Sequence, residues 1–142
     1  MLSYLVVAKT SSPGLIRFNT ATQQIDELYN GGGAPQTLSV DEDNGNVYWV
    51  NFEDEQHKVL KNPYGGLTVD LNISYPGEIR ITQDLLHLYV LYPSRNRIDK
   101  YKKSSLELVE NINTLDNPKE IVAGFGKCFK NYVYVLFCII NE

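Results

Sequence analysis

The acidic stretch from Asp41 to Gly45 (Asp-Glu-Asp-Asn-Gly) carries the side chains in this sequence that most resemble a calcium-binding loop. An EF-hand loop requires glycine at its sixth position and a bidentate glutamate at its twelfth. Here Gly45 is the fifth residue and Phe52 is the twelfth. We therefore interpret the stretch as a hairpin turn in which Asn44-Gly45 supplies positive φ angles.

Two histidines, His57 and His87, could ligate a metal or transfer a proton, but neither lies in an H-x-H or H-E-x-x-H arrangement. His57 follows the acidic residues Glu53 to Glu55, in a loop that either contacts a ligand or is simply solvated. His87 precedes an apolar segment, and we expect it in a loop or at a sheet edge.

Motifs for nucleophilic catalysis or nucleotide binding are missing, since the sequence has no G-x-S-x-G, G-x-G-x-x-G or P-loop pattern. Gly31 to Gly33 lacks the lysine and the following helix that hold phosphate, and we expect a flexible loop there. Cys128 and Cys138 do not make a disulfide framework, and free or buried thiols are favoured over a bridge. Asn72-Ile73-Ser74 is a glycosylation sequon that matters only in a secreted chain. No catalytic residue, cofactor or metal ion is predicted.

Length and composition are those of one ordinary domain, with 142 residues, 43% apolar residues and a net charge of -4. Acidic and basic residues are mixed, which predicts neither nucleic acid nor an anionic membrane as a partner. The first ten residues lack the basic region of a signal peptide. The longest apolar run, Tyr132 to Ile140, is too short for a membrane-spanning helix of about 20 residues, and we expect a buried strand.

An internal repeat sets the elements that would position any of these residues. Pro35, Pro76 and Pro118 recur at intervals of 41 and 42 residues. Apolar residues follow each proline at the third and fifth positions, as in a strand with one buried face. These are Leu38 and Val40, Ile79 and Ile81, and Ile121 and Ala123.

Three further strands are predicted after each first strand, separated by turn residues such as Asn44-Gly45 and Asn62-Pro63. The second strands are Tyr4–Val7, Val47–Val50, Leu88–Leu91 and Val133–Leu136. The third strands are Ile16–Phe18, Val59–Lys61 and Ile98–Tyr101, and the fourth are Ile25–Tyr29, Leu67–Leu71 and Leu106–Val109. Four short strands in every 41–45 residues indicate an all-β chain with the blades of a β-propeller. A β-sandwich is the main competitor, but it does not require this self-similarity.

The segment Leu38 to Asn51, which contains Tyr48-Trp49, resembles the YWTD repeat of low-density lipoprotein receptor class B modules. Leu88–Leu91 with Asn96-Arg97-Ile98 looks like the related NHL or YVTN repeats. The resemblance implies a rigid scaffold that usually closes with six blades, binds protein or small molecules through its loops, and is often extracellular. It also implies that some relatives are hydrolases or lyases with a metal in the central channel.

Counting strands gives one partial propeller domain, with repeats near residues 4–34, 35–75, 76–117 and 118–142. With the strands of a blade labelled A to D from the inside, the chain begins at strand B and ends at strand B. Three blades do not close a ring. We expect either a partial propeller from a longer chain, which the surplus apolar strand favours, or a homodimer in which the first strand of each chain completes the other's first blade.

The leading functional hypothesis is a non-catalytic scaffold that binds a protein or a small molecule through the connections between second and third strands. The predicted ligand-binding residues are Glu53, Asp54, His57, Tyr92, Arg95 and Arg97. A channel-metal hydrolase or lyase, using Glu78 and Glu120 beside Asp41, is the first alternative. A chain whose function is self-association is the second.

Overall fold

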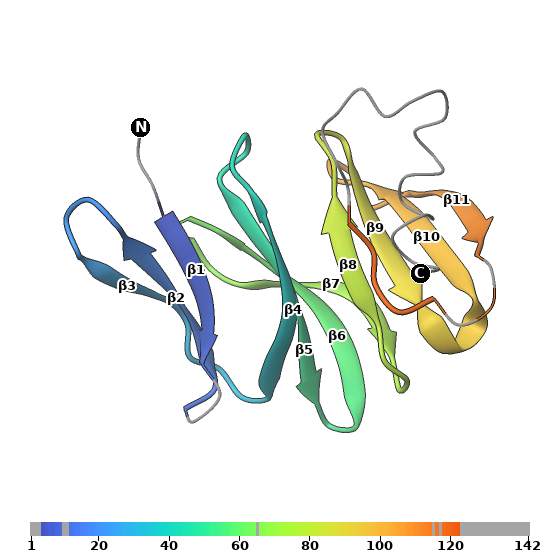
Figure 1. Cartoon of the computed structure of the whole chain (residues 1–142), viewed down its shortest axis with the longest axis horizontal. Helices are drawn as coiled ribbons and strands as arrows, with labels where there is room; N and C mark the ends of the chain where they lie inside the picture. Colours follow the sequence, from blue (N-terminus) through green and yellow to red (C-terminus); the bar gives the residue numbers. More distant parts are fainter. Residues whose placement is uncertain (1–3, 10–11, 65, 115, 117, 123–142) are drawn as a thin grey trace. The chain divides into compact units, whose positions relative to one another are not determined.

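The computed structural model describes residues 4–9, 12–64, 66–114, 116 and 118–122, which form strands and one short 3-10 turn (Figure 1). The chain divides into two compact units, Met1–Pro76 and Gly77–Glu142. No helix among the described residues is long and apolar enough to cross a membrane. The expected strand from Tyr132 onward, Cys128 and Cys138 lie outside the described residues.

The first unit contains two antiparallel sheets. The first sheet has the order β1 (Tyr4–Lys9), β2 (Gly14–Asn19) and β3 (Ile25–Tyr29). The second has the order β4 (Ala34–Asp41), β5 (Asn46–Glu53), β6 (Gln56–Pro63) and β7 (Val69–Tyr75).

The second unit contains the third sheet, with the order β8 (Arg80–Gln83), β9 (His87–Tyr92), β10 (Arg97–Lys102) and β11 (Leu108–Asn113). A 3-10 turn, η1 (Pro93–Arg95), joins β9 to β10. In all three sheets each strand pairs with its neighbour in sequence, which is the meander expected of a blade. The all-β prediction is confirmed, and the sheets of three and four strands are consistent with propeller-like blades. The number of blades stays a prediction, as do the domain boundaries.

The core of the first unit lies between its two sheets, because each sheet turns alternate side chains toward the other. Leu15, Val47, Trp49 and Leu60 are buried in one cluster. Trp49 is fully buried there and packs between the two sheets. The following partly buried side chains pack around that cluster: Val6, Ala8, Leu28, Tyr29, Leu38 and Tyr64.

Several predicted strand limits are wrong by a few residues. β7 begins at Val69 and β11 at Leu108, each two residues later than expected. Leu67 is 86% exposed, and Leu106 has a φ of 57° in a turn, so neither apolar side chain belongs to its strand. Likewise β8 begins only at Arg80, and residues 118–122 belong to no strand although a first strand was expected there.

The alignment of the first sheet with the third also shifts by one residue. Lys9 pairs with Gly14 and Tyr92 pairs with Arg97, so both hairpins have four-residue connections. Leu5–Ala8 therefore corresponds to Leu88–Leu91 in the structure. The sequence pattern instead aligns Tyr4–Val7 with Leu88–Leu91. A shift of one residue exchanges the two faces of a strand, so Val7 takes the face of Val90.

Candidate functional site

The two sheets of the first unit expose their connecting loops at two opposite ends. At the end that we call the β5–β6 end lie the β1–β2, β3–β4 and β5–β6 connections. The β2–β3, β4–β5 and β6–β7 connections lie at the β4–β5 end (Figure 1). Each end has a hollow: residues of both sheets line the one at the β4–β5 end, and the first sheet with the β3–β4 connection lines the other.

At the β4–β5 end, Arg17 on β2 lies between two tyrosine rings. Its guanidinium carbon is 4.9 Å from the ring centre of Tyr4 on β1 and 5.1 Å from that of Tyr64, which follows β6. Arg17 is also paired across the strands with Asp26 on β3, and its Nη2 donates to Oδ2 of Asp26 at 2.8 Å. Stacking and pairing together fix the position of this partly buried cation.

These residues line a cavity of about 410 Å³ between the two sheets. Its lining is Tyr4, Val6, Arg17, Val40, Glu42, Gly45 and Tyr64. The backbone N–H of Tyr64 donates to the carbonyl of Gly45 at 2.8 Å, which ties the ring to the β4–β5 turn. Burial raises the pKa of Tyr64; the nearby Arg17 lowers it, and Glu42 and Asp41 raise it further. The phenol of Tyr64 is therefore a stable hydrogen-bond donor at neutral pH.

The stretch from Asp41 to Gly45 forms the predicted hairpin turn between β4 and β5, but the expected positive φ occurs only at Gly45 and not at Asn44. The Oδ1 of buried Asp41 accepts hydrogen bonds from the backbone N–H and the side-chain amide of Asn44, and Gly45 has a φ of 63°. The carboxylate of Asp41 thus stabilises the turn itself. Gly45 also belongs to the cavity wall, which gives this turn a second role.

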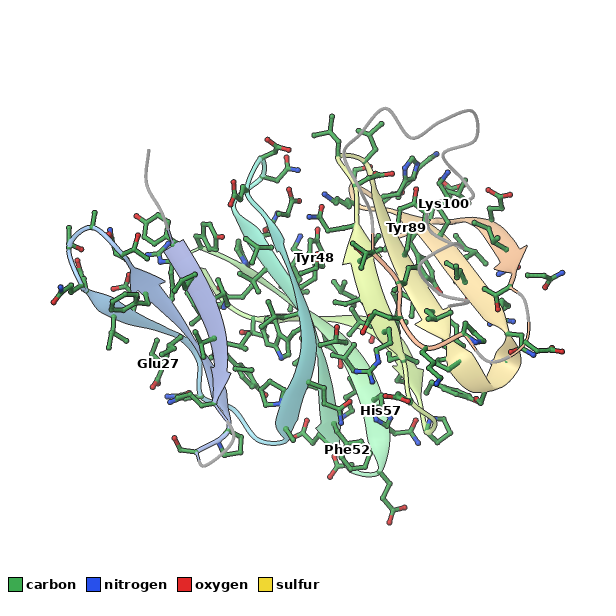
Figure 2. All side chains as sticks on the ribbon, in the orientation of Figure 1. Glu27, Tyr48, Phe52, His57, Tyr89 and Lys100 are labelled. Carbon is green, nitrogen blue, oxygen red and sulfur yellow. The ribbon has the colours of Figure 1, made fainter. Side chains whose placement is uncertain are left out.

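At the β5–β6 end, Asp54 and Glu55 have φ angles of 52° and 61°, as in a two-residue type I′ turn. Nζ of Lys58 lies 3.5 Å from Glu53 and 3.8 Å from Asp54, so one lysine faces two acids. The His57 ring lies 4.7 Å from that of Phe52, its cross-strand partner (Figure 2). Three of the predicted ligand-binding residues, Glu53, Asp54 and His57, therefore share this hairpin.

The glycine loop between β3 and β4 packs against β5 and is not the loose connection expected from its sequence. The hydroxyl of Tyr29 and the side-chain amide of Asn51 both donate to the carbonyl of Gly32, at 2.8 and 3.1 Å. Burial, then the charge of Glu53, raises the pKa of Tyr29, and its contact with Asn51 lowers it.

Beside this loop is an open hollow of about 430 Å³. Nζ of Lys9 lies 3.5 Å from the carboxylate of Glu27 at its wall. Its lining is Lys9, Ser12, Pro13, Glu27, Asn30, Gly31 and Gly32. The hollow is more open to solvent than the cavity at Arg17.

The other three predicted ligand-binding residues lie in the second unit. Tyr92 is buried, and the guanidinium carbons of Arg97 and Arg95 lie 5.2 and 6.0 Å from its ring centre. Arg97 also contacts the buried carboxylate of Asp99 at 2.9 Å, whereas Arg95 is exposed. Tyr92 and Arg97 thus contribute to internal packing, and Arg95 offers its surface to solvent. Their role in ligand binding stays a prediction.

The residues considered for a channel metal have other contacts. Glu78 pairs with Arg80, and the carboxylate of Glu120 accepts from the backbone N–H of Ile121 at 3.1 Å. His87 lies 3.3 Å from Asp84. In the part of the chain that the structure describes, no group of three or more His, Cys, Asp or Glu side chains could hold a metal ion.

Sequence reasoning missed the cavity around Arg17. Its residues come from strands of two sheets and from two connections, β4–β5 and β6–β7, and no local motif unites them. The pairing of Arg17 with Asp26 would follow from the correct β2–β3 register, but Tyr64 reaches Arg17 only through packing between sheets.

Comparison with known proteins supports the fold and leaves the function open. No protein-family model and no curated protein matches the chain. Among solved structures, the apo form of AztD from Citrobacter koseri matches 85% of this chain with a TM-score of 0.64 and 16% identity. A structural-genomics protein of unknown function from Bacteroides thetaiotaomicron matches 86%, with a TM-score of 0.57 and 13% identity. A chain of the nidogen/laminin complex matches 76%, with a TM-score of 0.45 and 12% identity.

The chain spans 34% of the first two of these chains and 58% of the third. Together with the three antiparallel sheets, the structural likeness supports a propeller-like fold. The YWTD, NHL or YVTN type of the repeat stays a prediction.

Proposed function

We propose that this chain is part of a non-catalytic, propeller-type binding scaffold that holds a protein partner in the cavity around Arg17. The observation that carries the proposal is the position of Arg17, stacked between Tyr4 and Tyr64 over a cavity of about 410 Å³. Arginine and tyrosine are the residue types most enriched at the centres of protein interfaces.

The cavity is suited to a segment that carries hydrogen-bond acceptors. The bonds between Arg17 and Asp26 use Nε and Nη2 of the guanidinium, at one edge of the group. Arginine has five N–H donors, so part of its donor set remains for a carboxylate or a backbone carbonyl. Val6 and Val40 add apolar walls. Because Arg17 is already held by stacking and pairing, binding costs little additional side-chain entropy.

The β5–β6 end is a second candidate surface of opposite character. Glu53, Asp54 and Glu27 place three carboxylates near the open hollow, against Lys9 and Lys58. This surface favours a basic partner, and it contains three of the residues predicted from the sequence, Glu53, Asp54 and His57. The connection that carries Arg95 in the second unit remains a further proposed contact. A channel-metal hydrolase or lyase stays an untested alternative.

A random peptide library displayed on phage tests the proposal even though the partner is unidentified. Peptides selected on the wild-type chain are measured against two variants that each lose one cation, Arg17→Gln and Lys58→Gln. We expect the peptides to be rich in Asp and Glu and to lose at least tenfold in affinity on Arg17→Gln alone. Far-UV circular dichroism and thermal melts confirm that both variants are folded.

Selected peptides that bind Arg17→Gln as tightly as wild type would contradict the proposal. If the peptides lose affinity for Lys58→Gln but not for Arg17→Gln, they bind at the β5–β6 end and not in the cavity around Arg17. Arg17→Lys is the stricter variant, because it keeps the charge but loses the planar donor set. A fall in affinity with this variant also supports specific recognition by the guanidinium.

A further inference from the structure

Among the described residues, one strand edge of the first sheet has no partner, whereas the corresponding strand in each of the other two sheets is paired. β4 pairs with β5 in the second sheet, and β8 pairs with β9 in the third. β1 is the counterpart of β5 and β9, but among the described residues it pairs only with β2. Its other edge presents backbone N–H and C=O groups that can accept an added strand.

The same sheet has an exposed apolar face. Leu5 and Val7 on β1 are 55% and 44% exposed, and Ile25 on β3 is 61% exposed. The counterparts of Leu5 and Val7 in the third sheet, Leu88 and Val90, are completely buried. An apolar group of this kind on a sheet is typical of an interaction surface.

Residues 118–122 occupy a position in the second unit that corresponds to the position of β4, a first strand, in the first unit. Leu38, three residues after Pro35, packs against the buried cluster that contains Leu15, as do Val6 and Ala8 of β1. Ile121, three residues after Pro118, packs against the cluster of Ile98, Tyr89 and Leu91. The two sets of cluster residues are equivalent, since β1 and β9 align at Ala8 and Leu91 and pair there with Leu15 and Ile98.

The two observations fit each other. Residues 118–122 lie against a sheet in the manner of a first strand but belong to no strand in the described part of the chain. β1 is a second strand whose first strand is missing from the described residues. We infer that residues 118–122 of one copy pair with the free edge of β1 in a second copy.

This pairing would cover the apolar face in the same step. In the first unit, β4 pairs with β5 while the face of β5 that carries Trp49 packs on Leu15 and Ala8. In the repeat Trp49 of β5 aligns with Val90 of β9, and Val90 aligns with Val7 of β1, so Trp49 corresponds to Val7. Adding residues 118–122 of a second copy to β1 therefore brings Val7 and Leu5 against Leu91 and Ile98 of that copy. The β4–β5 register, in which Leu38 is opposite Trp49, places Ile121 opposite Val7.

Disulfide cross-linking tests the predicted pair directly. Two differently tagged chains, both with Cys128 and Cys138 replaced by serine, carry Val7→Cys or Ile121→Cys and are mixed before mild oxidation. We expect a disulfide between the two tagged chains. Val6→Cys is the matched control, because the Val6 side chain lies on the opposite face of β1 and we expect no disulfide from it.

Mass measurement gives an independent result. Light scattering of the wild-type chain should give twice the monomer mass of 16.1 kDa, or more if the head-to-tail contact does not close. Val7→Asp should shift the mass to that of the monomer with an unchanged far-UV circular dichroism spectrum, because Val7 is exposed within the chain. Leu67→Asp, at an 86% exposed apolar position of the same unit, should associate as wild type does.

The inference does not depend on the cavity around Arg17, so the two proposals fail separately. A chain that stays monomeric at all concentrations and forms no Val7–Ile121 disulfide would overturn it. The occupant of this edge would then be a different protein or another part of a longer chain. Association that survives Val7→Asp and forms no cross-link would also overturn it, since the copies would then meet elsewhere.

Discussion

The ring of Tyr29 at the end of β3 lies 5.1 Å from the indole of Trp49 on β5, with an angle of 54° between the two planes. This tilted contact joins the last strand of the first sheet to the second strand of the next. The hydroxyl of the same tyrosine holds the carbonyl of Gly32, so Tyr29 supports both the core and the loop that connects the sheets.

Replacing Trp49 with alanine should severely destabilise the first unit. The side chain is fully buried among Leu15, Val47 and Leu60, so its removal leaves a large cavity. We expect a loss of about 3–5 kcal/mol in the free energy of unfolding. Urea unfolding followed by far-UV circular dichroism measures this loss. Tryptophan fluorescence cannot be used for the variant, because Trp49 is the only tryptophan in the sequence. Leu67→Ala at an exposed position is the control, and an equal effect of both changes would contradict this account.

Asn62→Ala should lower the free energy of unfolding by about 1–3 kcal/mol, because it leaves partly buried hydrogen-bond acceptors without their donor. The buried amide of Asn62 donates to the carbonyl of Leu28 in the first sheet at 3.0 Å and to Oγ1 of Thr68 at 3.1 Å. Denaturant titration gives the loss. Thr68→Val removes only the second of these contacts, and we expect a smaller effect. A larger effect of Thr68→Val would show that the bond between the sheets contributes little.

Gly33→Ala and Gly45→Ala should differ in cost although both residues have positive φ angles, of 83° and 63°. A Cβ on Gly33 would lie 2.5 Å from Nδ2 of Asn51 and 2.7 Å from the carbonyl oxygen of Phe52. A Cβ on Gly45 would meet only Tyr64, at 3.5 Å. We expect about 1 kcal/mol for Gly45→Ala from the backbone conformation alone, and clearly more for Gly33→Ala. Thermal melts of the two variants compare them, and equal melting temperatures would refute the close packing of the glycine loop.

Alkaline pH should unfold the protein through its buried tyrosines. Burial, then the charge of Asp41, raises the pKa of Tyr48 to about 12, whereas an unfolded tyrosine has a pKa of about 10. The unfolded chain thus releases the proton first, and stability is intact below about pH 10 and falls as the pH rises toward 12. One such tyrosine lowers stability by up to about 1.4 kcal/mol per pH unit in this window.

Tyr48→Phe removes this contribution and should make the decline between pH 10 and pH 12 shallower. Burial also raises the pKa of Tyr89 and Tyr92, so part of the decline should remain in the variant. Denaturant unfolding at several pH values, with tyrosinate absorbance at each, measures the difference. An unchanged slope in Tyr48→Phe would show that Tyr48 ionises as readily in the folded protein as in the unfolded one.

The strand pattern could be predicted because alternation and repetition are local properties of a sequence. Val47–Val50 and Leu88–Leu91 lie in the predicted strands, and Trp49 faces the predicted core. The fourth strands were misplaced because Leu67 and Leu106 are apolar residues in the connections before the strands: Leu67 is exposed to solvent, and Leu106 has a positive φ. A pattern of apolar residues does not distinguish these from buried leucines.

The site was less predictable than the fold because it depends on contacts between sheets. Arg17, Tyr4 and Tyr64 are separated by whole strands, and only the packing of two sheets brings them together. Register has the same difficulty. Several alignments of β1 with β9 place apolar residues opposite apolar residues. The pairing of Lys9 with Gly14 in the β1–β2 hairpin shows which alignment is correct.

The meander order of the strands has a consequence for how the chain folds during synthesis. In the described part of the chain each strand pairs only with its neighbours in sequence, so these hairpins can close as soon as their two strands have emerged from the ribosome. Pairing between strands that are neighbours in sequence gives a lower contact order than pairing between distant strands, which favours faster folding. The slow step is then the docking of complete sheets, when Trp49 closes over Leu15. Until that docking, the first sheet exposes apolar faces on both sides, and chaperone dependence should be greatest at this stage of translation.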